Sequence, residues 1–217
     1  MAVVVTGASG FVGRSLCRAL AGRGHAVRAV LRPGVPAPGP GIDRAEIDDL
    51  RNAARAHQID ETGADAAKIA AEINSDLTRD FAAAARTAGA GRVVFLSSAG
   101  AQEAERRLAA GESLEAMWLE RPYQTSKLAA ERALEGFERG GYAVVILRAP
   151  LVYGPDAPGN FRQLRRLMER GMRLLGRARS AESLLGDLVL DSTPLREALG
   201  WRPRWTLVEG LAESVRG

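Results

Sequence analysis

The stretch that decides the fold opens the chain, as residues 1–34: MAVVVTGASGFVGRSLCRALAGRGHAVRAVLRPG. Ala2–Val5 is a short, continuous apolar run rich in valine, which predicts a strand buried on both faces of a parallel sheet. Gly7, Gly10 and Gly13 follow with the spacing G-x-x-G-x-x-G. This order predicts a strand that leads into a tight, glycine-rich turn.

A helix is predicted after this turn, because apolar residues recur at helical spacing from Phe11 to Leu20. Gly22 and Gly24 suit the C-terminal cap of that helix. A second apolar run, Ala26–Leu31, supplies the next strand. The opening residues therefore predict a strand–turn–helix–strand unit.

Glycines in such a turn let the backbone approach a pyrophosphate, since a side chain there would hold it away. The first N–H groups of the helix and the positive end of its dipole then bind the anion. The pattern predicts a dinucleotide site. Its candidate residues are Gly7, Ser9, Gly10, Phe11, Val12 and Gly13.

The end of the second strand indicates which dinucleotide would bind. An acid there would hold the ribose 2′-OH of NAD, whereas an arginine accommodates the 2′-phosphate of NADP. Arg32 follows the strand, and no acid does, which favours NADP over NAD. Arg14 is a second candidate for that phosphate, and the abundance of arginine leaves an incidental Arg32 as the alternative.

The remaining pattern alternates strands with helices, which predicts an α/β fold with a Rossmann-type, doubly wound parallel sheet. A third strand is expected within residues 42–50, with Asp48 or Asp49 at its carboxyl end. A helix over residues 64–88, a strand within 91–101, a helix around YQTSK and a strand within 142–155 follow.

Tyr123 and Lys127 lie four residues apart in RPYQTSKLAAERAL, so they share one face of the predicted helix. They are candidates for an acid–base couple, and the alternative is an ordinary surface helix. Lys68 and Lys127 are the only lysines among 30 Lys plus Arg. A lysine kept where arginine would serve equally well favours the first interpretation.

Several classes of function are disfavoured. The net charge is +4, but the arginines are interleaved with acids, as on a solvated surface rather than a nucleic-acid site. Cys17 is alone, and His25 and His57 lie far apart, so we expect no disulfide and no metal site. No apolar run suits a signal peptide or a membrane span, so the cytoplasm is the expected location.

Four motifs, TGASGFVG, VVFLSSAGA, PYQTSKLAAERAL and VVILRAPLVYGP, resemble those of the extended short-chain dehydrogenase/reductases. More narrowly, they resemble the NAD-dependent epimerase/dehydratase branch, which acts on nucleotide sugars. NAARAHQIDETGAD, GNFRQLRRLMERG and LDSTPLREALGWRPRWTLVEGL are similar to bacterial UDP-N-acetylglucosamine and UDP-glucose 4-epimerase-like proteins and UDP-quinovosamine dehydrogenases.

Compared with that family, this chain is short. A helix and most of a strand are missing between Asp49 and Arg51, and a larger piece between Arg179 and Leu184. Natural shortening and omitted segments of a longer protein both explain this. The resemblance implies an NAD(P)-binding domain over residues 1–155 and a reduced, truncated substrate-binding region over 156–217.

The resemblance also implies hydride transfer between a sugar carbon and the nicotinamide, with Tyr123 as acid–base catalyst. Lowering a phenol pKa from about 10 to near 7 requires about 4 kcal/mol of stabilisation of the anion. Lys127 and the positive nicotinamide would supply it. Ser98, with Ser97 as the adjacent alternative, would bind the reacting oxygen, and Asn74 would support Lys127 through water.

Further roles follow from the same resemblance. The predicted partner is a small molecule, a UDP-sugar, and a homodimer through helices near residues 81–90 and 122–137 is expected. A non-catalytic NAD(P)-binding sensor and an NADP-dependent reductase of a non-nucleotide carbonyl remain as alternatives. Tyr123 and Lys127 would also contact the cofactor, Lys127 through the nicotinamide ribose. Additional cofactor residues would be Asp48, Asp49, Ala53, Ala54, Pro150 and Val152, and additional substrate residues Ser97, Asn160 and Arg162.

Overall fold

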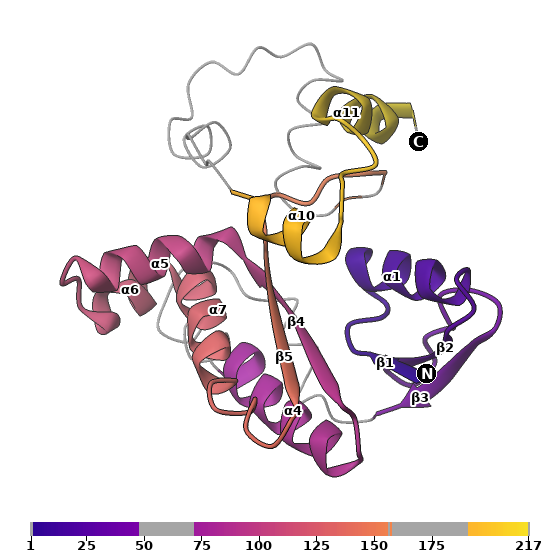
Figure 1. Cartoon of the computed structure of the whole chain (residues 1–217), viewed down its shortest axis with the longest axis horizontal. Helices are drawn as coiled ribbons and strands as arrows, with labels where there is room; N and C mark the ends of the chain where they lie inside the picture. Colours follow the sequence, from indigo (N-terminus) through magenta and orange to yellow (C-terminus); the bar gives the residue numbers. More distant parts are fainter. Residues whose placement is uncertain (1, 48–71, 156, 158–190, 217) are drawn as a thin grey trace. The chain divides into compact units, whose positions relative to one another are not determined.

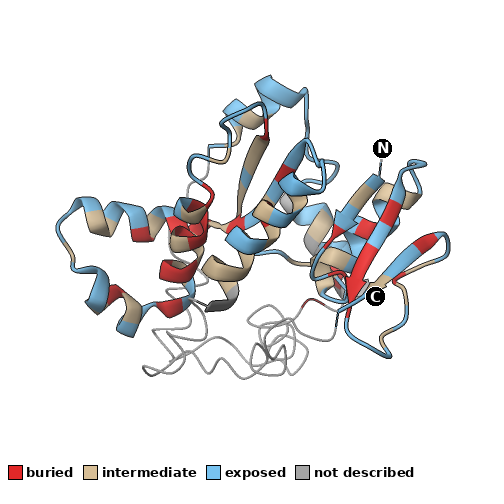
Figure 2. Cartoon of the chain, turned by 90° about the horizontal axis from the view of Figure 1, so that it is seen from below, coloured by how far each residue is buried: buried red, intermediate tan, exposed pale blue. Residues whose placement is uncertain are grey.

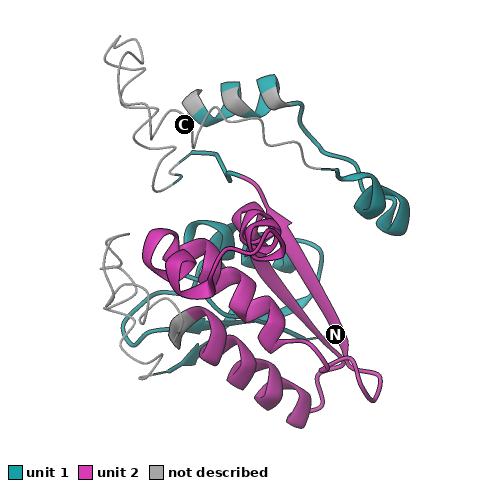
Figure 3. Ribbon diagram, turned by 90° about the vertical axis from the view of Figure 1, so that its left-hand side faces the viewer, with its two compact units in different colours: residues 1–48, 151–217 teal, residues 49–150 magenta. Residues whose placement is uncertain are grey.

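The chain forms two compact units (Figure 3). Residues 1–48 and 151–217 make up unit 1, and residues 49–150 make up unit 2. The domain boundary that we predict after residue 155 remains a prediction. The computed structural model describes residues 2–47, 72–155, 157 and 191–216.

Unit 1 contains the predicted strand–turn–helix–strand (Figure 1). Strands β1 (Ala2–Val5), β2 (Ala26–Leu31) and β3 (Ile42–Glu46) pair in parallel in the order β1-β2-β3. Helix α1 (Phe11–Ala21) connects β1 to β2. Near the C-terminus, α10 (Thr193–Leu199) and α11 (Leu207–Arg216) complete the described part of this unit.

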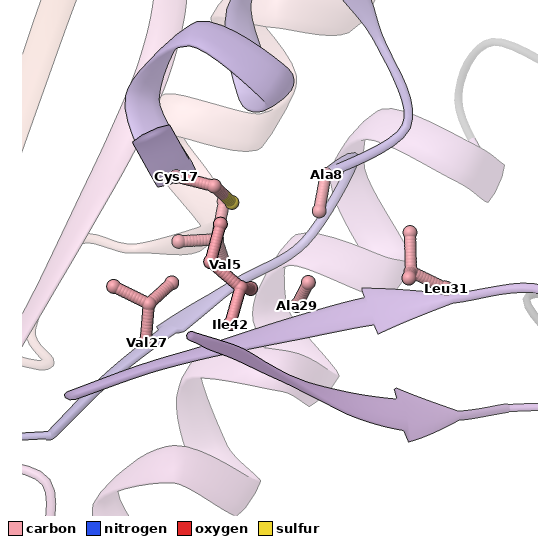
Figure 4. Close-up of a cluster of buried hydrophobic side chains, with 7 residues drawn as sticks. All are labelled: Val5, Ala8, Cys17, Val27, Ala29, Leu31 and Ile42. Atoms are coloured by element: carbon pink, nitrogen blue, oxygen red, sulfur yellow. The ribbon is translucent and has the colours of Figure 1, made fainter. Parts of the chain in front are cut away.

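The core of unit 1 lies between α1 and one face of its sheet (Figure 4). Cys17 projects from α1 into this core and is fully buried, and burial raises the pKa of its thiol, so it serves as a packing residue. Val5 is buried, but Val4 is 51% exposed, because side chains alternate along a strand and α1 packs on the side of Val5. The expectation that β1 is buried on both faces was wrong. The core consists of Val5, Ala8, Cys17, Val27, Ala29, Leu31 and Ile42.

Unit 2 is built on two parallel strands, β4 (Arg92–Ser98) and β5 (Ala143–Ala149), which pair from Arg92 with Ala143 to Ser98 with Ala149. A π-helix, η1 (Glu72–Asp76), runs directly into α4 (Leu77–Thr87). The predicted helix over residues 64–88 is thus confirmed from residue 72 onward, and its earlier part lies outside the described residues. Between the two strands come α5 (Ala99–Ala109), α6 (Leu114–Glu120) and α7 (Pro122–Ala133).

Two apolar clusters hold the helices of unit 2 in place (Figure 2, where buried residues are red). One joins Leu134, just after α7, to Val93 of β4 and Ala82 of α4. The other joins Leu128 of α7 to α5 and to Met117 of α6. Helix α7 is therefore packed on several sides, and this packing fixes the helix that carries the Tyr–Lys pair. The parallel strands and connecting helices confirm the predicted Rossmann-type α/β class.

Candidate functional site

The glycine-rich turn has the close backbone approach that the spacing predicts. Gly7 has a φ of +62°, which glycine adopts at low cost, and its carbonyl accepts a hydrogen bond from the N–H of Gly10 at 2.9 Å. A Cβ at Gly13 would lie 2.1 Å from that same Gly7 oxygen. Only glycine fits at residue 13, since the first turn of α1 lies directly against the backbone of the glycine-rich turn.

The N-terminus of α1 is suited to an anion. Gly10 is the N-cap residue, no side chain caps the helix, and its first turn carries no acid. The N–H groups of that turn and the positive end of the helix dipole therefore meet no competing negative charge from the helix itself. This fits the pyrophosphate of a dinucleotide. Arg32 follows β2 directly and is exposed, as the NADP interpretation requires.

The segment after β5 lies beside this turn within unit 1. A Cβ at Gly154 would lie 3.0 Å from Cζ of Phe11, so the Phe11 ring packs on the loop that also contains the exposed Val152. Tyr153 lies against α11, because a Cβ at Gly210 would be 2.8 Å from its hydroxyl oxygen. The glycine-rich turn with α1 and the loop after β5 are both predicted to bind the cofactor. They lie far apart in the sequence and are in contact at Phe11.

A Gly13→Ala variant is expected to lose dinucleotide binding and about 1–3 kcal/mol of stability, because its Cβ would displace Gly7. Thermal unfolding and calorimetric titration with NAD and NADP would measure both effects. Gly91→Ala is the matched control, since a Cβ there meets nothing within 4 Å. Tight cofactor binding by Gly13→Ala would contradict the role of this turn.

Tyr123 and Lys127 lie on one face of α7, as predicted. The Lys127 Nζ is 5.9 Å from the centroid of the Tyr123 ring and 4.9 Å from that of Phe95. It also donates a hydrogen bond to the carbonyl oxygen of Leu96, on β4, at 3.3 Å. Tyr123 is 47% exposed, so the residue is only partly covered by the rest of the chain. The pair is therefore assembled beside β4.

Burial dominates the electrostatics of the pair in the chain alone. Desolvation raises the pKa of Tyr123, so in the chain alone the phenol is neutral and a poor base. Desolvation lowers the pKa of Lys127, and the carboxylate of Glu131 partly opposes this change. Burial thus sets the direction of the Tyr123 pKa in the chain alone, and the phenolate would need the additional positive charge of the nicotinamide that we expect beside Lys127.

The two serines at the end of β4 have different surroundings. Ser98 is the N-cap of α5, where its Oγ accepts a hydrogen bond from the N–H of Gly100 at 3.1 Å and keeps its own hydrogen to donate. Ser97 is buried and donates its hydroxyl to Glu131. The geometry favours Ser98 over Ser97 as the hydroxyl that meets a substrate, and both roles remain predictions.

Asn74 contacts α7, the helix of Tyr123 and Lys127, through the side chain of Ser126. Its Nδ2 donates to the Oγ of Ser126 at 2.9 Å, and that hydroxyl donates to the carbonyl oxygen of Tyr123 at 2.8 Å. Asn74 sits in the π-helical turn of η1, an irregularity that is frequent at functional sites. Its predicted support of Lys127 through water remains a prediction.

Sequence reasoning missed two residues beside the pair, Glu131 and Arg148, which form an ion pair at 2.6 Å. An available signal was the acid one helical turn after Lys127. Among the described residues, no group of three or more His, Cys, Asp or Glu could hold a metal, and no helix is long and apolar enough to cross a membrane. The predicted site residues that lie outside the described part of the chain are Asp48, Asp49, Ala53, Ala54, Asn160 and Arg162.

Two curated proteins are similar to this chain in sequence. The chain is 32% identical over 196 residues to a 2-alkyl-3-oxoalkanoate reductase of Stenotrophomonas maltophilia, covering 81% of this chain and 58% of that protein. It is 30% identical over 190 residues to a UDP-glucose 4-epimerase of Vibrio cholerae, covering 79% and 58%. The matches thus span little more than half the length of these curated relatives.

Solved structures show the same fold. A UDP-glucose 4-epimerase of Thermotoga maritima, determined with UDP-glucose, superposes with a TM-score of 0.69 at 20% identity, covering 100% of this chain and 98% of that one. The model of the NAD dependent epimerase/dehydratase family matches residues 3–199. The chain therefore belongs to the NAD dependent epimerase/dehydratase family.

Proposed function

We propose that this protein is an NAD(P)-dependent enzyme of the epimerase, dehydratase or dehydrogenase type that acts on a UDP-sugar. The observation that carries the proposal is the arrangement on α7. Lys127 lies beside the Tyr123 ring and donates a hydrogen bond to the carbonyl oxygen of Leu96, two residues before Ser98 on β4. A phenol, an ammonium and a hydroxyl are the groups that proton transfer at a sugar oxygen requires.

The nicotinamide of a bound dinucleotide would accept a hydride in its oxidised form and donate one in its reduced form. In unit 1, the Gly7–Gly13 turn and the N-terminus of α1 would hold its pyrophosphate, and Arg32 a 2′-phosphate when the cofactor is NADP. The fit rests on the close approach of Gly13 to Gly7, which no other residue type allows. NADP is favoured over NAD by Arg32.

The residues of unit 2 would manage the proton. Ser98 would donate a hydrogen bond to the reacting oxygen, and Tyr123 would take the hydroxyl proton as hydride leaves the adjacent carbon, then return it in the reverse step. Lys127 would stabilise the phenolate from the same helix face. Since burial alone raises the pKa of Tyr123, the phenolate would form only with a further positive charge, which the oxidised nicotinamide carries.

The UDP-sugar is supported by the Vibrio cholerae relative. Asn160 and Arg162 belong to the proposal as substrate residues, whereas Ser97, which is buried and bonded to Glu131, stays only as the alternative to Ser98. A second candidate is an NADP-dependent reductase of a non-nucleotide carbonyl, which the Stenotrophomonas maltophilia relative and Arg32 favour. A non-catalytic NAD(P)-binding protein is the third, because the matches span little more than half of each curated relative. The expected homodimer would be checked by sedimentation.

A substrate panel separates these candidates. The purified chain would be incubated with NAD or NADP and either UDP-glucose or UDP-N-acetylglucosamine, and separately with NADH or NADPH and a 2-alkyl-3-oxo acid. The absorbance of the reduced nicotinamide would be followed, and the sugar products would be separated. Conversion of a UDP-sugar supports the main proposal, including an epimer formed without net change in absorbance. Turnover of the oxo acid alone favours the reductase, and cofactor binding without any turnover favours the non-catalytic protein.

A further inference from the structure

A buried carboxylate joins three elements of unit 2. Glu131, on α7, is 6% exposed and follows Lys127 by one helical turn. Its Oε1 accepts from the hydroxyl of Ser97, on β4. The guanidinium of Arg148, on β5, donates to both of its oxygens, from Nε at 3.0 and 3.1 Å and from Nη2 at 2.6 Å. One side chain therefore connects α7 to the ends of both strands.

The contacts of Glu131 with Ser97 and Arg148 lie next to Ser98 of the proposed site. Ser97 and Arg148 are partners in the parallel register of β4 and β5, and Ser97 directly precedes Ser98. A buried ion pair costs desolvation energy, and apolar residues of similar volume often stabilise a fold as well or better. Fold stability alone therefore does not require charged groups at this point.

We propose that Glu131 is a positioning residue, whose carboxylate fixes the Lys127 face of α7 against the ends of β4 and β5 and balances the Lys127 ammonium. This inference rests on the proposed function, since the groups that Glu131 positions are Ser98, Tyr123 and Lys127. A neutral residue of the same shape would keep the packing and lose the charge.

The charges around Glu131 come from three elements. Lys127 lies on its own helix, Arg148 faces it from β5, and Glu105 of α5 binds the other side of Arg148, with 2.9 Å between Glu105 Oε2 and Nη1. The hydroxyl of Ser97 faces it from β4. Glu131 raises the pKa of Lys127 against the lowering caused by burial, so removing its charge should let that pKa fall.

The first test measures this charge coupling without any need for turnover. The chain has two lysines, so reductive methylation with ¹³C-formaldehyde gives few NMR signals, and Lys68→Arg assigns that of Lys127. In Glu131→Gln the titration of Lys127 is expected to move to lower pH. Glu105→Gln is the matched control, because it removes the other acid on Arg148, and its Lys127 should titrate as in the wild type. An unmoved titration in Glu131→Gln, or an equal shift in the control, overturns the proposal.

The second test measures positioning in the active enzyme. Glu131→Gln is expected to lower kcat about 10- to 100-fold, with KM changed less than about threefold, because misplaced groups act on the reaction rather than on binding. Glu131→Asp, which keeps the charge, should recover part of kcat, and Glu105→Gln should stay within about twofold of wild type. A wild-type kcat in Glu131→Gln contradicts the role.

If the wild-type chain turned over none of the substrates, the proposed function would be refuted. The lysine titration would then still test whether Glu131 is coupled to Lys127. Should Glu131→Gln not fold, the double variant Glu131→Met with Arg148→Met replaces the ion pair by apolar groups of similar length. Because this double variant removes one negative and one positive charge together, its readout is kcat, which is expected to fall as in Glu131→Gln, and a wild-type kcat there would overturn the proposal.

Discussion

A Tyr123→Phe variant is expected to lose turnover by about 10²- to 10⁴-fold while binding NAD(P) almost as tightly as the wild type. Phenylalanine keeps the ring beside Lys127 and removes only the hydroxyl that would exchange the proton. Initial rates on the substrate of the unmodified protein give the loss, and calorimetric titration with the cofactor gives the binding.

Tyr142→Phe is the control for this variant. Tyr142 is 4% exposed, and its hydroxyl makes a long hydrogen bond of 3.4 Å to the carbonyl oxygen of Ala82. Tyr142 directly precedes β5, at the end of the paired strands opposite to Ser98. Removing this hydroxyl should leave turnover within about twofold. Undiminished turnover in Tyr123→Phe would show that another group moves the proton.

A Lys127→Met variant is expected to lose about 10²-fold in kcat, and its remaining activity should shift to higher pH. Burial already raises the pKa of Tyr123, and the substitution removes the Lys127 ammonium, 5.9 Å from the centroid of the Tyr123 ring, which would stabilise the phenolate. The sign follows directly: a phenol with a higher pKa acts as a base only in more alkaline solution. The pH dependence of kcat measures the shift.

Two further replacements make this result specific. Lys68→Met removes the chain's other lysine and should leave the pH profile unchanged. Lys127→Arg keeps a positive charge but replaces a compact ammonium by a planar guanidinium, so it should recover only part of the activity. Full activity in Lys127→Met, with an unshifted profile, would exclude a role for this lysine in proton transfer.

Local patterns predicted much of this arrangement. The strand–turn–helix–strand of residues 1–34 followed from apolar runs and glycine spacing, because both act over a few neighbouring residues. Tyr123 and Lys127 share a helix face because the helical repeat places residues four apart together. These features depend little on the rest of the chain.

Features set by contacts between distant residues were not predictable in this way. Whether Ser97 or Ser98 is buried depends on how β4 pairs with β5, and a shift by one residue would exchange them. The bond between Glu131 and Arg148 depends on the same register. Whether the Tyr123 pKa rises or falls depends on how far the phenol is buried, and burial cannot be read from the spacing of Tyr123 and Lys127.

The discontinuous composition of unit 1 has a consequence for how the chain is synthesised. Strands β1 to β3 and α1 leave the ribosome early and can form their small core from contacts close in sequence. Phe11, however, packs on Gly154, which emerges only after residues 49–150 have been translated. During synthesis, Phe11 therefore lacks its contact with the Gly154 loop until all of residues 49–150 have left the exit tunnel.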